Sequence, residues 1–476
     1  MKVDVREVEL AAAEAELVAV GLFDGEPALP EIAAVPGVAA ARGEFKKLSV
    51  LHPEGAAPLL VVGLGKRDEA NPERLRVAAA LAAKEAGSLE ARSLAWVLPS
   101  SGDPAAAAEA LVVGTILGAY RFDRFRSDGE DSPPSLEALT LLGPAELAGA
   151  VEAARACAEA QNRARDLQST PANVATPAFL AERAEQIAAG AEALSAEIFG
   201  PAEIAAKKMG GLVAVSQGGP VEPRLIVLRY SGGGDGPTLG LVGKGVTFDT
   251  GGISLKPGAG MHEMKMDMSG AAAVLEAVAA IAELALPVNL IAVVPSTENM
   301  PSGTAIKPGD VITQYDGTTV EVNNTDAEGR LILADALAYT VEQGAERIVD
   351  LATLTGAVLI ALGSTYAGLI CNDDEFAAAV SGAGERSGEL VWRLPLHPEY
   401  KELMKGTVAD LSNLGSKREA GTITAGSFLE EFVGETPWAH IDIAGTAWDV
   451  GRAYAGKDAT GFGVRLLVDL VRAQAS

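Results

Sequence analysis

The chain has 476 residues, more than one typical hydrophobic core accommodates, so we expect two domains. Its 38 basic and 64 acidic residues give a formal net charge of -26, which argues against binding to nucleic acid or to acidic membranes. The two cysteines are too few for a disulfide scaffold or a thiolate zinc site, and the sequence lacks the apolar runs of a signal peptide or a membrane span. We therefore expect a soluble cytoplasmic protein with no membrane partner.

The first third of the chain alternates strand and helix patterns. Apolar runs at 59–62, 94–98 and 136–142 predict buried strands, and helical periodicity predicts helices over 74–87 and 104–125. Such alternation is typical of an α/β domain with a mainly parallel sheet.

A long helical pattern over 144–167 comes next. We expect this helix to connect two domains, 1–160 and 161–476. The second part is the larger and contains more glycine-rich loops. Its predicted strands lie at 225–228, 239–242, 290–294 and 348–351, and its predicted helices at 270–284 and 330–342.

The most informative segment leads into the last of these helices and reads Asn324-Thr-Asp-Ala-Glu-Gly-Arg-Leu331. Side chains alternate between faces in an extended segment, so Asp326 and Glu328 are expected to point the same way. Two acids aimed at one point suit a cation, whereas Arg330 suits an anion. Read alone, the segment fits equally well an acidic turn that complements the dipole of the helix.

Two other segments place polar residues beside predicted apolar elements. The glycine-rich segment 243–252 follows a predicted strand and carries Lys244 and Asp249, with Lys256 a few residues later. Ligand sites in open α/β sheets lie beyond the carboxyl ends of strands. A phosphate-binding loop is a poor match, because the Gly-x-x-x-x-Gly-Lys-Ser/Thr pattern is absent. In the second segment, Asp267 precedes a predicted helix, where it could serve as an ordinary N-cap.

Four carboxylates from three loops would repel one another unless they are compensated. They are Asp249, Asp267, Asp326 and Glu328. Two divalent cations about 3.5–4 Å apart would resolve the repulsion. Lys244 and Lys256 could instead neutralise the acids as buried ion pairs, a structural alternative that composition leaves open. The four histidines are scattered and match no zinc motif, so a metal here would be held mainly by oxygen.

Taken together, these motifs resemble those of the leucyl aminopeptidase family, the cytosolic two-metal aminopeptidases. The matching motifs are VGKGVTFDTGG at 242–252, MKMDMSGAAAV at 264–274, ENMPSG at 298–303, NTDAEGRL at 324–331, DLATLTGA at 350–357 and WAHIDIAG at 438–445. The resemblance implies a two-domain α/β fold. A smaller N-terminal α/β domain (macro-domain-like) precedes a larger C-terminal α/β metallopeptidase domain with a mixed central sheet.

The same resemblance implies two divalent metal ions per subunit, Mn²⁺ or Zn²⁺. The residues that match the ligands of the tightly held ion are Lys244, Asp249, Asp267 and Glu328. Those that match the ligands of the more exchangeable ion are Asp249, Asp326 and Glu328. A lysine can ligate a metal only as the neutral amine, so its ordinary pKa of about 10.4 must fall when the ions bind.

The resemblance also implies that two positively charged side chains take part in catalysis. Lys256 matches a residue that stabilises the oxyanion of the intermediate, and Arg330 matches one that holds a bicarbonate anion acting as general base. A water bridging both ions would be the nucleophile. The residues expected to bind the substrate are Met264, Asn324, Thr353, Leu354 and Gly356.

We therefore expect a metal-dependent leucyl aminopeptidase that hydrolyses the N-terminal peptide bond of short peptides and prefers leucine-like residues. The resemblance also implies a homohexamer with its active sites facing an interior cavity. One alternative is an aminopeptidase fold that also acts as a DNA-binding regulator, against which the net charge argues. Another is a homologue without catalysis, against which the complete set of metal-binding and catalytic positions argues.

Overall fold

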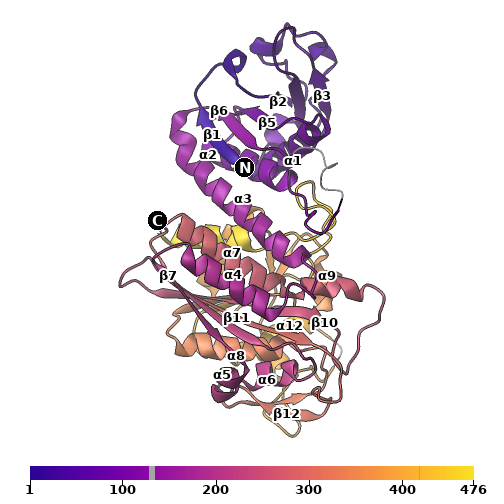
Figure 1. Cartoon of the computed structure of the whole chain (residues 1–476), viewed down its shortest axis with the longest axis vertical. Coiled ribbons are helices and arrows are strands. Elements are labelled where there is room, and N and C mark those ends of the chain that lie inside the picture. The colour runs from indigo at the N-terminus through magenta and orange to yellow at the C-terminus, as the bar shows by residue number, and fades with distance from the viewer. Residues whose placement is uncertain (128–134, 418, 476) are drawn as a thin grey trace. The chain divides into compact units, whose positions relative to one another are not determined.

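We examined a computed structural model of the chain, which describes residues 1–127, 135–417 and 419–475. The chain divides into two compact units (Figure 1). The smaller unit comprises residues 1–162 and 451–457, and the larger comprises residues 163–450 and 458–476. The division falls within the long helix α3 (Ala148–Ser169), which follows a short 3-10 turn at Ala145–Leu147. The predicted α/β fold with two domains is confirmed.

The smaller unit is built on one six-stranded sheet. Its strands are, in spatial order, β1 (Lys2–Arg6), β6 (Ala138–Leu142), β5 (Ser93–Val97), β2 (Leu17–Phe23), β4 (Leu59–Gly65) and β3 (Leu48–Leu51). All neighbours are parallel except β3, which is antiparallel to β4. The mainly parallel sheet predicted for this part of the chain is therefore confirmed.

Two helices pack against this sheet and against each other, α1 (Pro72–Ser88) and α2 (Pro104–Gly118). Each begins with an Asx N-cap followed by proline: the side chains of Asn71 and Asp103 accept bonds from the first free N–H groups. The prediction of a helix over 104–125 is wrong at the C-terminal end. Helix α2 ends at Gly118, and glycine has a low helix propensity because it loses most backbone freedom on folding.

The larger unit contains a nine-stranded mixed sheet among the described residues. In spatial order its strands are β16 (Val391–Arg393), β15 (Ala367–Cys371), β18 (Trp438–Asp442), β14 (Arg347–Ala352), β9 (Thr238–Gly243), β11 (Asn289–Asn299), β8 (Arg224–Ser231) and β7 (Leu194–Phe199), while β10 (Gly245–Asp249) pairs with the end of β11. The central strands β18, β14, β9 and β11 run parallel, and β15, β8 and β7 are antiparallel to their inner neighbours.

Helices cover both faces of this sheet (Figure 1). One face carries α4 (Pro177–Ala189) and α7 (Ser269–Glu283), and the other carries α6 (Gly210–Ser216), α8 (Gly329–Glu342) and α12 (Gly421–Glu430). The central strands are buried on both sides, which explains why β9, β11 and β14 read as continuous apolar runs. The strands and helices predicted for the second part of the chain are all present.

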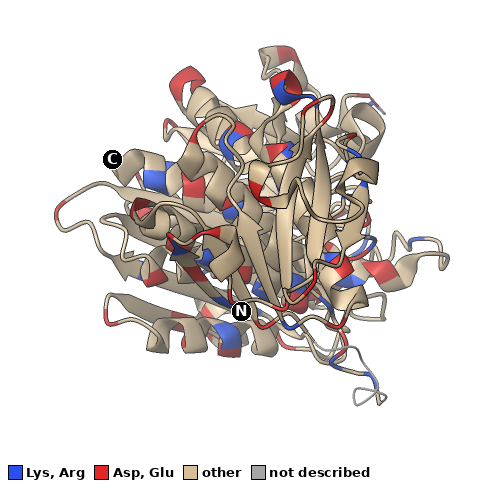
Figure 2. Ribbon diagram, turned by 90° about the horizontal axis from the view of Figure 1, so that it is seen from above, with Lys and Arg blue, Asp and Glu red and all other residues tan. Residues whose placement is uncertain are grey.

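The remaining elements of the larger unit lie around this core. They are the helices α5 (Pro201–Ala206), α9 (Gly356–Leu362), α10 (Asp374–Ser387), α11 (Pro398–Glu402) and α13 (Val464–Ala475), the 3-10 helix η7 (Met261–Met268), and a small sheet of β12 (Asp310–Thr313), β13 (Thr319–Val322) and β17 (Leu411–Ser412). Acidic and basic residues are interspersed over helices and loops (Figure 2). Every helix in the described part of the chain is too short or too polar to cross a membrane.

Candidate metal centre

Three loops of the larger unit bring the predicted acids together. Asp249 is the last residue of β10, Asp267 lies near the end of η7, and Asp326 and Glu328 lie between β13 and α8. Strand β10 runs parallel to β11, so its carboxyl end opens beyond the edge of the central sheet. This is where open α/β sheets place their ligand sites.

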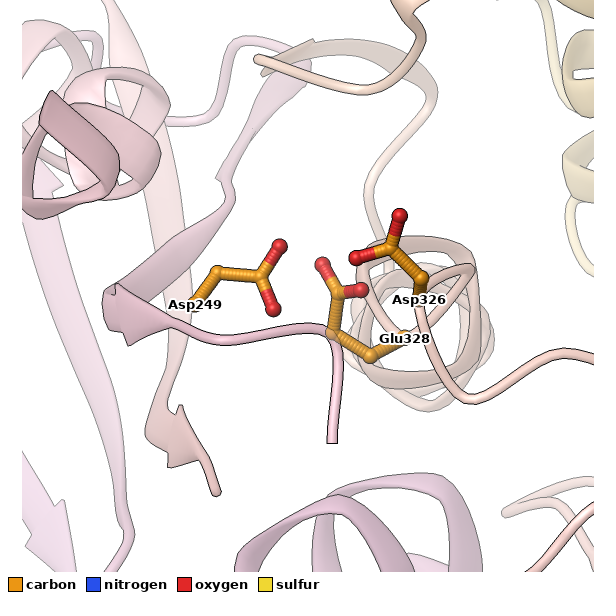
Figure 3. A group of neighbouring side chains, drawn as sticks. All are labelled: Asp249, Asp326 and Glu328. Carbon is orange, nitrogen blue, oxygen red and sulfur yellow. The ribbon is translucent and has the colours of Figure 1, made fainter. Parts of the chain in front are cut away.

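Three of the carboxyl groups converge on one point. Oxygen atoms of Asp249, Asp326 and Glu328 all lie within 4.8 Å of one another, and Figure 3 shows the three groups turned toward a common space. The segment that carries the last two is a turn, so the expected extended conformation is wrong. Ala327 N–H donates to the Asn324 carbonyl at 3.2 Å, and Glu328 has helical backbone angles. The turn achieves the convergence that alternation along a strand was expected to give.

Lys244 lies against the buried side of this group. Its Nζ is 2.8 Å from Asp267 Oδ1, 2.8 Å from Glu328 Oε1 and 3.0 Å from the Thr353 carbonyl oxygen. Burial alone would lower the pKa of Lys244, but the carboxylates of Asp267, Glu328 and Asp249 outweigh it and raise that pKa above its ordinary value. Without a metal, Lys244 is therefore an ammonium group that contributes positive charge to the acids.

Lys256 bridges the outer acids. Its Nζ lies 2.7 Å from Asp249 Oδ2 and also donates to Asp326 Oδ1. Burial opposes the charge of Lys256, but Asp249 and Glu328 raise its pKa above the ordinary value. The ion pairs of the structural alternative are therefore present. They leave four carboxylates facing two ammonium groups, an excess of acid.

The acid excess is visible in individual groups. Burial, reinforced by Asp249 and Glu328, raises the pKa of Asp267 above its ordinary value despite the opposing charge of Lys244. Burial and Asp249 raise the pKa of Glu328 in the same way. Asp267 Oδ2 is buried and lies 2.7 Å from Lys244 Nζ, so one ammonium group serves both oxygens of Asp267 as well as Glu328. A divalent cation would neutralise the surplus carboxylate charge, so this oxygen-rich set of residues fits a metal.

Asp267 does not cap the following helix. The N-cap position of α7 is Met268, which offers no capping side chain, and Asp267 Oδ1 accepts instead from Thr353 Oγ1 at 2.7 Å. The ordinary structural reading of Asp267 is therefore wrong.

Arg330 is the second residue of α8 and is only 7% exposed. Its Nε has no hydrogen-bond partner among the described residues. Burial lowers the pKa of Arg330 to about 10, against the raising effects of Glu328 and Asp442. A buried guanidinium N–H without a partner, at the positive end of a helix, is an arrangement that suits a small anion.

The five residues expected to bind substrate occupy different surroundings. Thr353 contacts Asp267 and Lys244 through the bonds given above. Asn324 Oδ1 accepts from Asp326 N–H at 2.9 Å, so its carbonyl end holds the turn. Leu354 N–H donates to Asp442 Oδ1 at 3.1 Å. Met264 is half-buried within η7, and Gly356 is exposed at the start of α9.

Two asparagines near the acids were missed by the sequence reasoning. Asn299 Nδ2 donates to Asp249 Oδ1 at 2.8 Å, and Asn413 Nδ2 donates to the Asn324 carbonyl at 2.7 Å. Asn413 Oδ1 also accepts from Asn323 N–H at 2.8 Å. For Asn299 the signal was a polar residue ending an apolar strand within the ENMPSG motif. Asn413 lies outside every motif, and its sequence gave no signal.

Comparison with known proteins connects both units to one family. A sequence model of the catalytic domain of the cytosol aminopeptidase family matches residues 162–468, and a model of that family's N-terminal domain matches residues 23–129. The probable cytosol aminopeptidase of Roseiflexus castenholzii is 46% identical over 90% of this chain and 90% of its own length. That of a Geobacter species is 48% identical over 90% of this chain and 89% of its own length.

Solved structures are similar over nearly the whole chain. The bottromycin maturation enzyme BotP in complex with Mn has a TM-score of 0.88 and 37% identity, covering 97% of this chain and 100% of that one. A mutant of tomato leucine aminopeptidase has a TM-score of 0.89 and 35% identity, covering 99% of this chain and 96% of that one.

Proposed function

The chain belongs to the cytosol aminopeptidase family and is therefore a metallo-aminopeptidase, and we propose that it releases leucine-like N-terminal residues from short peptides with two divalent ions, Mn²⁺ or Zn²⁺. The observation that carries the two-metal proposal is the excess of buried carboxylate over ammonium at the end of β10. The Mn complex of BotP and the name of the tomato enzyme support the choice of metal and of side chain.

In this proposal Asp249 and Glu328 would be shared by both ions, as the family resemblance implies, and their position beside Asp326 supports that assignment. Asp326 completes one position, and Lys244 with Asp267 completes the other. Bound there, two divalent ions would acidify a water molecule and polarise the scissile carbonyl. Lys244 must give up its proton to become a ligand, and the dications would reverse the charge balance that raises its pKa.

Lys256 and Arg330 supply the remaining chemistry in this proposal. Cations bound at Asp249 and Asp326 would take over the ion pairs that Lys256 makes with these carboxylates. The Lys256 ammonium group would then be available to stabilise the oxyanion that forms on the substrate. The unpartnered Nε of Arg330 would hold bicarbonate, which accepts the proton as general base. Use of a bound anion as the base agrees with the absence of a fitting Glu or His base from these motifs.

The substrate's free α-amine would bind at the metal centre, which restricts cleavage to the first peptide bond. We propose that the first side chain and main chain of the substrate contact Met264, Asn324, Thr353, Leu354 and Gly356.

Catalysis is assigned in this proposal to the domain 161–476. The family resemblance supports a homohexamer whose active sites face an interior cavity, which would admit short peptides and exclude folded proteins. The names of the two bacterial relatives place those proteins in the cytosol, and we propose the same compartment here. A DNA-binding role has no support in the relatives and structures above, and we do not propose one.

Hydrolysis of leucine p-nitroanilide tests the proposal. The protein is depleted of metal with a chelator, and activity is measured after adding back Mn²⁺, Zn²⁺ or Co²⁺ one at a time. We expect no activity without metal, recovery with at least one ion, and no hydrolysis of the N-acetylated substrate. Absence of activity with every ion would contradict the proposed function.

A further inference from the structure

Asn299 ties together two of the loops that carry the acids. It is the last residue of β11 and only 1% exposed. Its Nδ2 donates to Asp249 Oδ1 at 2.8 Å and to the Thr325 carbonyl at 3.0 Å, and lies 3.5 Å from Glu328 Oε2. One amide group therefore contacts the end of β10 and the turn that leads into α8.

The Asn299 side chain is itself held in place. Its backbone carbonyl accepts from Thr250 N–H at 3.0 Å and from Thr250 Oγ1 at 2.7 Å. A Cβ added at Gly252 would lie 2.8 Å from Asn299 Oδ1 and 3.0 Å from Thr325 Oγ1, so the amide is closely packed on that side. Gly252 has a φ of +63°, which favours glycine there independently. These contacts hold the end of β11 and leave little room beside the Oδ1 atom of the amide.

Asn299 differs from the lysines in how it would respond to a cation. The ammonium groups of Lys244 and Lys256 carry positive charge into the acid group, so each must lose its proton or move when metals bind. The neutral amide of Asn299 adds no charge, so its bond to Asp249 requires no loss of a proton when a cation binds. It also leaves Asp249 Oδ2, the oxygen that faces Lys256, available as a ligand.

We propose that Asn299 is a positioning residue that orients Asp249 and the turn before Asp326 for the more exchangeable metal ion. The proposal rests on the proposed two-metal function. The three ligands proposed for that ion are Asp249, Asp326 and Glu328. The Asn299 amide contacts Asp249 and Glu328 directly and contacts the backbone next to Asp326. Two of the four ligands proposed for the tightly held ion, Asp267 and Lys244, are held by Thr353 instead, so that ion depends less on Asn299.

Asn299→Ala tests the proposal, with Asn289→Ala as the matched control. Asn289 is the first residue of the same strand, and its amide also ties loop backbone: it accepts from Gly233 N–H at 3.0 Å and donates to the Gly234 and Gly236 carbonyls at 2.9 Å. Mn²⁺ is titrated calorimetrically into each metal-depleted protein. Because residues that orient metal ligands typically contribute about 10–100-fold in affinity, we expect that loss at the weaker step for Asn299→Ala and no change for Asn289→Ala.

Asn299→Leu repeats the test with a side chain of similar size, and circular dichroism reports whether each variant folds. The proposal is overturned if folded Asn299→Ala or Asn299→Leu binds both ions within twofold of the wild type. It is also overturned if neither variant folds, because Asn299 would then serve the fold itself. Failure of the wild type to bind two Mn²⁺ ions would instead count against the two-metal function. If the wild type binds two Mn²⁺ ions and the Asn299 variants bind them with the same affinities, only the positioning role is rejected.

Discussion

Two groups of buried charge in the larger unit differ in their balance. The arginine cluster consists of Arg163, Arg183 and Glu276: the carboxylate is 0% exposed and lies 2.8 Å from Arg163 Nε and 2.6 Å from Arg183 Nε. The acid cluster consists of Lys244, Asp249, Lys256, Asp267, Asp326 and Glu328. The first has one acid for two cations, and the second has four acids for two cations.

This difference separates a structural ion group from a candidate site. Both carboxylate oxygens of Glu276 accept hydrogen bonds from arginine, so that cluster is satisfied by the chain itself. The acid cluster contains carboxyl groups whose pKa is raised by burial and by one another, despite the two lysines beside them. Burial of charge is common to both clusters. The acid excess is what points to a cation supplied from outside.

Removing one acid from the acid cluster should have the largest effect. Glu328→Gln keeps the shape of the side chain but removes a charge proposed to bind both ions. Metal ions contribute several kcal/mol to such reactions, so at 1.36 kcal/mol per tenfold we expect kcat/KM for leucine p-nitroanilide to fall by at least roughly 10³-fold. Metal content, measured by mass spectrometry, should fall with it.

The matched control for Glu328 lies at the other end of the same helix. Glu342 is the last residue of α8, and its carboxylate accepts from Tyr315 Oη at 2.8 Å. Glu342→Gln should leave kcat/KM within twofold of the wild type. A Glu328→Gln enzyme that keeps more than a tenth of wild-type activity would remove the functional distinction between the two clusters.

Arg330→Ala is expected to have the next largest effect. Loss of one acid–base or electrostatic contributor should lower kcat by about 10²–10³-fold while metal content stays at the wild-type level. Turnover is measured with and without added bicarbonate. Equal turnover of variant and wild type under both conditions would contradict the proposed anion site. Arg183→Ala, in the arginine cluster, is the comparison and should change stability without this loss of kcat.

The sequence predicted the fold better than the contacts within the site. Continuous apolar runs identified β9, β11 and β14 because these strands are buried on both faces. The predictions for the C-terminal end of α2 and for the conformation of the segment at Asp326 were wrong. Local backbone conformation at single residues depends on hydrogen bonds that periodicity does not encode.

The motifs also contained most of the candidate site, since the structure brings Asp249, Asp326 and Glu328 together, while their roles as ligands stay predictions. Their supporting contacts were out of reach. Asn413 bonds to the backbone of a segment 89 residues earlier in the chain, and only the folded structure reveals that proximity. The unpartnered Nε of Arg330 likewise depends on burial by distant residues.

Breaking the arginine cluster should change stability and leave catalysis intact. Glu276→Gln leaves two arginines beside a neutral amide, and loss of one partner from a buried ion group costs about 3 kcal/mol. We expect the free energy of unfolding, measured in urea, to fall by that amount with kcat/KM within twofold of the wild type. Glu283→Gln is the control: its carboxylate lies 3.9 Å from Arg163 Nη2 and is 36% exposed, so about 0.5 kcal/mol or less is expected. A large loss of kcat/KM in Glu276→Gln would mean that a cluster without surplus acid also serves catalysis.

Added metal should stabilise the folded protein through the acid cluster and not through the arginine cluster. A cation that binds only the folded protein stabilises it by RT ln(1 + [L]/Kd), which is about 1.4 kcal/mol at ten times Kd and corresponds to a rise in Tm of roughly 2 °C for a unit as large as the one that carries the acid cluster. Mn²⁺ is added to the metal-depleted wild type, Glu276→Gln and Glu328→Gln, and Tm is followed by circular dichroism. The wild type and Glu276→Gln should gain the same increment, since the arginine cluster has no surplus acid for a cation to satisfy. Glu328→Gln should gain much less, and an equal gain in all three proteins would place the stabilising cation outside the acid cluster.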